Sequence, residues 1–181
     1  MGMIENLIDA YQRQVSLPWE EMLSEQEKIW FCVYEPPYER RIEARLEEFR
    51  IKTLESGHLW RHINIAGAFE SWLIENEYHE EYFRVPSDLE YDLLDFIRHL
   101  VLLLRKEIEE TDANTIVAVT GIGSLYGIVR ASAVIDQAVK ETPIPGRLVF
   151  FFPGDRDARN YRLLKARDGW NYLATPIEAE E

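Results

Sequence analysis

Two glycines and a serine follow an apolar stretch near the middle of the chain, at a spacing that suits anion binding. The stretch runs from Ile116 to Val119, and residues 120–124 read Thr-Gly-Ile-Gly-Ser. Glycines let a backbone turn sharply, and the free N–H groups at the start of a following helix attract a phosphate or a carboxylate. The hypothetical site comprises Thr120, Gly121, Gly123 and Ser124, with Arg130 in the predicted helix.

The same turn lacks the residues that complete the two best-known nucleotide-binding loops. No Gly-Lys-Ser/Thr follows it, so a Walker P-loop is excluded, and no acid stands about 20 residues further on to bind a ribose. Apolar residues spaced three and four apart between Leu125 and Val139 predict a helix directly after the turn. The pattern favours a tight turn that packs this helix on a strand, with a nucleotide or anion site as the alternative.

Charged residues follow two other apolar runs, at the points where the predicted strands end. Glu35 follows the run 29–34, and Asp155, Arg156 and Arg162 follow the run 147–152. Because the carboxyl ends of parallel strands meet at one edge of a sheet, we expect these residues and the glycine turn to share one rim. The alternating charges after residue 154 are also typical of ion pairs on an exposed loop, so both interpretations stay open.

Residues with catalytic or metal-binding potential are few and scattered. His58 and His62 share one face of a predicted strand, but no third ligand is indicated. The nucleophile pattern G-x-S-x-G is absent around Ser124. The single cysteine, Cys32, lies in an apolar run and reads as a small buried residue. We therefore predict no catalytic residue, no metal site and no cofactor.

The charge of the chain narrows its classes of partner. The 181 residues carry 33 acidic and 20 basic side chains, a formal net charge of −13. Such a surface repels phosphate backbones, so direct nucleic-acid binding is not expected. No apolar stretch is long enough to span a bilayer and no secretory signal is recognised, so we expect a cytoplasmic protein without a membrane segment. The oligomeric state stays open.

Apolar runs bounded by proline, glycine and charged residues predict five strands, at residues 29–34, 59–65, 116–119, 147–152 and 170–174. The second run alternates more than the others, which favours a position near a sheet edge. Helical spacing predicts one helix before the first strand, at residues 3–15. It predicts further helices between the strands, at residues 37–55, 66–77 and 87–110 and after the glycine turn. This order predicts an α/β three-layer sandwich with a mostly parallel, Rossmann-like or P-loop-like sheet that lacks a Walker motif.

The length fits one α/β domain. We expect an N-terminal helical extension over residues 1–28, an α/β core over residues 29–175 and an acidic tail over residues 176–181. The helix predicted for residues 87–110 is apolar nearly all round, which indicates deep burial or a partner that covers it. The candidate partner interface on this helix consists of Leu93, Phe96, Ile97, Leu100 and Leu104.

Three short motifs follow the predicted strands in a fixed order. They are Glu35-Pro-Pro-Tyr-Glu-Arg-Arg41, Thr120-Gly-Ile-Gly-Ser124 with Arg130, and Phe152-Pro-Gly154 leading to Asn160-Tyr-Arg-Leu-Leu164. Together they resemble the BrxB family, which is encoded in BREX bacteriophage-resistance operons. The resemblance covers the chain from about Ile29 to Ala174.

The resemblance implies a non-catalytic component of a multi-protein defence system that acts as an adaptor or scaffold. It implies a PglZ-like protein of the alkaline-phosphatase superfamily as the partner, with an ATPase and a DNA methyltransferase as further BREX components. The alternative is a nucleotide- or anion-binding regulatory domain that uses the turn from Gly121 to Ser124.

Overall fold

Five parallel strands form the central sheet, in the spatial order β2-β3-β4-β1-β7. The computed structural model describes residues 2–75, 86–167 and 169–180. The strands span Ile29–Tyr34 (β1), Leu59–Asn64 (β2), Thr115–Thr120 (β3), Arg147–Asp157 (β4) and Thr175–Ile177 (β7). The predicted α/β class with a mostly parallel sheet is therefore confirmed, and β2 lies at an edge as expected.

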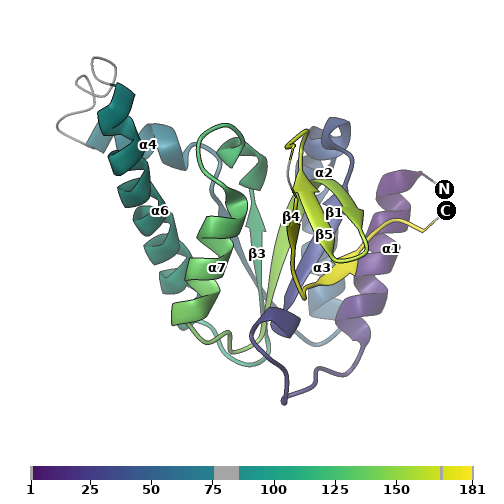
Figure 1. Cartoon of the computed structure of the whole chain (residues 1–181). Coiled ribbons are helices and arrows are strands. Elements are labelled where there is room, and N and C mark those ends of the chain that lie inside the picture. Colours follow the sequence, from purple (N-terminus) through teal and green to yellow (C-terminus); the bar gives the residue numbers. More distant parts are fainter. Residues whose placement is uncertain (1, 76–85, 168, 181) are drawn as a thin grey trace.

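Helices cover both faces of this sheet, so the molecule has three layers (Figure 1). One face packs against α1 (Met3–Ser16), α2 (Glu39–Ala44) and α3 (Leu46–Glu55). The other face packs against α4 (Ala68–Glu75), α6 (Pro86–Glu109) and α7 (Ala131–Glu141). The single-turn 3-10 helices are η1 (Gln26–Lys28), η2 (Pro36–Tyr38) and η3 (Ile122–Leu125).

The first strand shows why the sheet needs a helical layer on each face. Every residue of β1 is buried, and successive side chains of a strand point to opposite faces. Phe31 packs in the core on the α6 and α7 side, whereas Cys32 packs in the core under α1 and α3. Strands buried on both faces read as continuous apolar runs, which is why β1 is visible in the sequence.

The second half of β4 leaves the sheet as a hairpin. Residues 154–157 pair antiparallel with β5 (Asn160–Leu163), and β5 pairs with β6 (Trp170–Asn171). The predicted strand end at Phe152, followed by a polar loop, is wrong, because β4 continues to Asp157 and the segment after it forms β5, in which every second residue is buried. The short last strand predicted at residues 170–174 forms only at residues 170–171, as β6 of the antiparallel part, and the fifth parallel strand is β7 instead.

This hairpin covers β1 and β4 on the α7 side, where a helix would otherwise lie. Tyr161 and Trp170 pack against the ring of Phe31, with centroid distances of 4.5 and 5.9 Å. The hydroxyl of Tyr161 donates to the carbonyl of Ala174 at 3.1 Å, close to the start of β7. Burial of these large rings explains why a segment rich in charged residues folds onto the core.

Two helices differ from their predicted extents. The helix expected for residues 37–55 is divided at Arg45, whose backbone (φ −110°, ψ 15°) is not helical. The guanidinium of Arg45 contacts Glu5 of α1 at 2.5 Å and Glu48 of α3 at 2.8 Å, so the break lies where these helices meet. The helix expected directly after the glycine turn begins later, at Ala131.

The N-terminal helix is bound firmly to the rest of the fold. Tyr11 of α1 is fully buried, and its hydroxyl lies 2.5 Å from that of Thr53 in α3. Tyr11 is the donor, because the Thr53 hydroxyl itself donates to the carbonyl of Phe49 at 2.8 Å. Arg13 pairs with Glu180 at 3.2 Å, so the two ends of the chain lie together (Figure 1).

Candidate functional site

The loops that follow β1 and β3 meet the bend of β4 at the carboxyl edge of the sheet. Tyr34, the last residue of β1, lies opposite Pro153 of β4. A Cβ placed on Gly123 would lie 3.2 Å from Cγ of Pro153. The carbonyl of Pro153 accepts a hydrogen bond from the N–H of Leu164, just after β5, at 2.9 Å. Pro153 therefore contacts the end of β1, the turn after β3 and the residue after β5.

The glycine turn is wedged against the residues that follow β2. Gly121 has a φ of +83°, and a Cβ there would lie 2.4 Å from the backbone nitrogen of Ala66. The carbonyl of Thr120 accepts a hydrogen bond from the N–H of Ile65 at 2.9 Å, and its hydroxyl lies 2.7 Å from Nε2 of His62. The turn therefore fastens β3 to the edge strand.

Ser124 uses its polar groups inside the turn. Its N–H and its hydroxyl both donate to the carbonyl of Gly121, at 3.0 and 2.7 Å. The N–H of Tyr126 donates to the carbonyl of Gly123 at 3.2 Å. Anion binding at this turn stays a prediction, and it would have to use donors other than these.

Arg130 lies at the N-terminus of α7 and not inside a helix as predicted. Gly127 has a φ of +79°, a conformation that interrupts a right-handed helix, and α7 begins at Ala131. The carbonyl of Arg130 accepts a hydrogen bond from the N–H of Ala133 at 3.1 Å. Its side chain is exposed and forms no ion pair with any residue that the structure describes.

The other predicted arginines lie beyond the bend, on the hairpin, and each binds one carboxylate through two contacts. Arg156 contacts Glu178, just after β7, at 2.8 Å for both. Arg162 contacts Asp155 on the opposite hairpin strand at 3.0 and 2.5 Å. Glu35 is exposed at the start of η2, apart from these pairs. Arg156 and Arg162 therefore form ion pairs, on a hairpin rather than on an exposed loop, and a ligand site at this rim stays a prediction.

A polar contact that the sequence did not reveal joins the end of β1 to α2. The hydroxyl of Tyr34 donates to Oε2 of Glu39 at 2.5 Å. Burial of Glu39, reinforced by the charge of Glu43, raises the pKa of the Glu39 carboxyl. Burial also lowers the pKa of His62 on β2, despite the charge of Glu43. Tyr34 and Glu39 come from β1 and α2, so only the fold brings them together, whereas His62 lies on the edge strand β2, beyond β4 and β3.

A pocket of about 500 Å³ separates the start of α7 from the hairpin, and we call it the α7–hairpin pocket. One wall is the segment 126–132, which leads into α7. The other wall includes Leu163 of β5, Trp170 of β6 and residues of the loop between them. Arg130 belongs to the first wall and Arg167 to the second. The sequence identified Arg130 but not the opposite wall, because the hairpin was not predicted.

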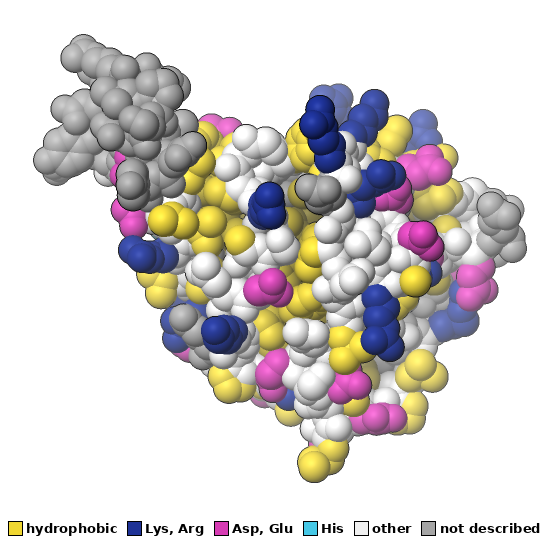
Figure 2. Space-filling view, viewed as in Figure 1, with side chains coloured by type: hydrophobic (Ala, Val, Ile, Leu, Met, Phe, Trp, Pro, Cys, Tyr) yellow, Lys and Arg dark blue, Asp and Glu magenta, His cyan; other side chains and the backbone are white. Residues whose placement is uncertain are grey.

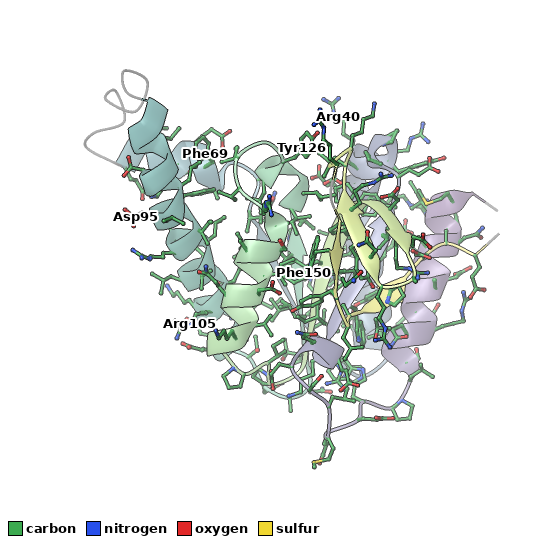
Figure 3. All side chains as sticks on the ribbon, in the orientation of Figure 1. Arg40, Phe69, Asp95, Arg105, Tyr126 and Phe150 are labelled. Carbon is green, nitrogen blue, oxygen red and sulfur yellow. The ribbon has the colours of Figure 1, made fainter. Side chains whose placement is uncertain are left out.

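Several arginines in the described part of the chain form no ion pair, and two of them line the α7–hairpin pocket. Most arginines bind a carboxylate, as Arg45 and Arg156 do. Among the described residues, six arginines form no ion pair: Arg40, Arg41, Arg130, Arg147, Arg159 and Arg167. Figure 2 shows Lys and Arg side chains gathered at the top of the molecule, the end at which Figure 3 places Arg40 and Tyr126.

The residues predicted as a partner interface lie mostly on the inner face of α6. The ring of Phe96 packs against that of Trp72 in α4, with centroids 5.4 Å apart. These side chains fill the core, and any role in partner binding stays a prediction. Four of the five are buried, and only Leu93 is half-buried; the buried ones are Phe96, Ile97, Leu100 and Leu104.

The outer face of α6 presents different leucines. Leu94 and Leu102 are 53% and 61% exposed. Residues spaced by four and eight along a helix share one face, so Arg98 lies between the two leucines. Arg98 is exposed and pairs with Asp95 at 3.1 Å. The outer face of α6 therefore combines isolated apolar side chains with a surface ion pair.

Further features limit the chemistry of the described residues. Within residues 2–75, 86–167 and 169–180, no group of three or more His, Cys, Asp or Glu could hold a metal ion. Cys32 is fully buried, and burial raises the pKa of its thiol, which opposes formation of a reactive thiolate. No helix in the described ranges has the length and apolar character needed to cross a membrane.

Comparison with known proteins identifies the family. Residues 61–177 match the model of a family described as BREX protein BrxB. No curated protein and no solved structure matches the chain. The matched segment includes the glycine turn, α6 and both walls of the α7–hairpin pocket. Because the match covers more than half of the 181 residues, the chain belongs to the BrxB family and is a component of a BREX bacteriophage-resistance system.

Proposed function

We propose that this BrxB protein is a non-catalytic adaptor that binds the PglZ-like, alkaline-phosphatase-superfamily component of its BREX system. Membership of the family makes other BREX proteins, including the ATPase and the DNA methyltransferase, the natural set of partners. The observation that carries the proposal is the outer face of α6, with Leu94 and Leu102 more than half exposed.

Exposed leucines on one helix face provide apolar area that a protein partner can bury. Each buried leucine side chain contributes roughly 1.5–3 kcal/mol to association before the costs of binding are subtracted. The exposed ion pair of Arg98 and Asp95 beside them would form part of a polar rim. Because the chain carries a net charge of −13, a protein partner suits this surface better than a nucleic-acid backbone.

Co-purification with the PglZ-like protein tests the proposal. The Leu94→Glu/Leu102→Glu double variant should lose the complex while its melting temperature stays close to that of the native protein, because both side chains are exposed. The matched control is Ile51→Glu/Leu54→Glu, which changes two side chains of α3, 40% and 42% exposed, in the opposite helical layer. The control should still co-purify. A double variant that retains the complex at native strength would contradict the assignment of this face.

The non-catalytic part of the proposal needs its own measurement. The contact between Tyr34 and Glu39 is the place where hydrolytic activity would reside, since both side chains titrate and both have raised pKa values. The purified protein should show no phosphoesterase or nucleotide hydrolysis. Activity that disappears in Glu39→Gln would show that Glu39 is catalytic. It would contradict the proposal that the protein is a non-catalytic adaptor.

A further inference from the structure

We propose that the α7–hairpin pocket binds an acidic segment of a protein partner, with an apolar side chain of that segment as the anchor. This site goes beyond the adaptor role, because it uses neither the outer face of α6 nor any assumption about the PglZ-like protein. Three features of the pocket support it: its size, its lining and its charge.

The size and lining of the pocket fit an apolar anchor. Its volume of about 500 Å³ lies within the usual range for ligand pockets, roughly 300–1,000 Å³. Ile128 and Val129 contribute to one wall, and Leu163 and Trp170 contribute to the other. An aromatic or branched aliphatic side chain would therefore meet apolar groups on both sides. Figure 2 shows apolar side chains between α7 and the hairpin.

The charge of the pocket points to carboxylates around that anchor. Arg130 and Arg167 line opposite walls, and neither forms an ion pair with a described residue. Arg156 and Arg162 on the same hairpin are each bound by a carboxylate of this chain. The two lining arginines therefore remain available to carboxylates from outside, and a guanidinium binds a carboxylate through two parallel hydrogen bonds.

The N-terminus of α7 also favours a carboxylate in the pocket. Arg130 precedes the helix with an extended backbone, and no side chain caps the first N–H groups. Ala131 and Ser132, which belong to the first turn, line the pocket as well. The positive end of the helix dipole thus lies beside the two arginines and favours a negative group.

A protein segment explains these features better than a nucleic acid does. Phosphate backbones bind where many cations are aligned, whereas this chain has an excess of 13 negative charges. An apolar cavity of limited size between two arginines instead matches one anchor residue flanked by Asp or Glu. Association would be fast at low salt and would weaken as salt screens the arginines.

The test uses the full chain labelled with ¹⁵N and the peptide acetyl-Asp-Glu-Leu-Phe-Asp-Glu-amide as the probe. Titration to millimolar concentration should shift the amide signals of residues 126–132, 163–167 and 169–170 and the indole signal of Trp170, with saturation. The same peptide with Lys at the four acidic positions should produce no such shifts. A single-stranded DNA oligonucleotide should also leave these signals in place.

The variant Arg130→Glu/Arg167→Glu should bind the probe about tenfold more weakly or not at all. The matched control, Lys140→Glu/Arg159→Glu, makes the same change in net charge at two cations that lie outside the pocket lining, and it should bind normally. Dispersed amide spectra of both variants show that they are folded, and Arg130→Gln/Arg167→Gln replaces the first variant if its spectrum collapses.

Three results would overturn the site: no saturable shift with the acidic peptide, equal binding of the lysine peptide, or binding of the oligonucleotide in place of the peptide. The α6 proposal fails or succeeds separately. Leu94→Glu/Leu102→Glu should bind the probe as the native protein does, because those leucines do not line the pocket.

Discussion

The backbone nitrogen of Ala66 lies only 2.4 Å from the point where Gly121 would carry a Cβ. A side chain at residue 121 would therefore push the loop after β2 away from β3, and its φ of +83° would strain any residue other than glycine. Gly121→Ala should lower the free energy of unfolding by roughly 3 kcal/mol, from the positive φ and the backbone collision together. Urea denaturation measures the change.

Gly127 is the natural control for this prediction. It has a similar φ of +79°, but a Cβ there would meet nothing within 4 Å. Gly127→Ala should cost about 1 kcal/mol from backbone strain alone. Equal losses for the two variants would mean that the contact with Ala66 contributes nothing measurable.

The two hairpin ion pairs allow a second prediction, because they share geometry but differ in exposure. The side chains of Arg156 and Glu178 are 25% and 36% exposed, and this pair joins the hairpin to the segment after β7. Arg162 and Asp155 pair across the hairpin in a more exposed position. Double-mutant cycles with alanine should give a coupling of about 1 kcal/mol for the first pair and a few tenths, about 0.3 kcal/mol, for the second.

The two coupling energies should also depend differently on salt concentration. Raising the ionic strength should reduce the coupling of Arg162 with Asp155 more than that of Arg156 with Glu178, because partly buried charges are screened less. A larger coupling for the exposed pair would contradict the view that the Arg156 contact anchors the end of the sheet.

The raised pKa of Glu39 predicts a pH dependence. The folded protein binds the Glu39 proton more tightly than the unfolded chain does, so this group favours folding at low pH. Its contribution is lost as the pH rises from the unfolded value, 4.5, through the higher folded pKa. Glu39→Gln keeps an oxygen acceptor for Tyr34 and removes the charge. The variant should gain melting temperature relative to the native protein as the pH rises from 4 to about 7.

His62 provides the internal check on that measurement. Its pKa is lowered by burial, so its contribution has the opposite sign, with stability lost as the pH falls below 6.5. Both proteins carry His62, and the difference between them therefore isolates Glu39. If the difference in melting temperature between the variant and the native protein does not change with pH, then the pKa of the Glu39 carboxyl is not raised by folding.

The hydroxyl of Tyr11 predicts how firmly α1 is held. Tyr11→Phe preserves the buried ring, which lies 5.3 Å from that of Phe49, and removes only the donor to Thr53. The loss should be about 1 kcal/mol, the usual value for one buried hydrogen bond. Tyr11→Ala should cost about 3–5 kcal/mol, because it also leaves a cavity. Thermal unfolding with a single transition would show that α1 and the sheet melt together.

The sequence identified those elements whose burial is uniform along the chain. β1 and β3 are buried on both faces and read as unbroken apolar runs, and the five buried residues of α1 recur at helical spacing. The turn at Gly121 was also predicted from the sequence, because two glycines follow the apolar run that forms β3. In these elements the secondary structure that the local sequence pattern predicts is also the one that burial in the fold requires.

The missed elements depend on distant partners. β5 alternates the polar residues Asn160 and Arg162 with Tyr161 and Leu163, and its burial is decided by Phe31, far away in the sequence. β7 is short and contains Pro176, which fits an edge strand but hides the strand pattern. The pocket could not be predicted for the same reason, since one of its walls is the hairpin.

The position of β1 in the sheet also sets the order in which the chain can fold during synthesis. β1 lies between β4 and β7, where Ile29 faces Leu148 and Cys32 faces Ile177. The ribosome therefore releases a fully apolar strand long before either of its neighbours exists. The nascent chain must keep this strand from associating with other chains until the last strand emerges. The segment 61–177 that matches the family model, made alone, would lack the strand that joins β4 to β7.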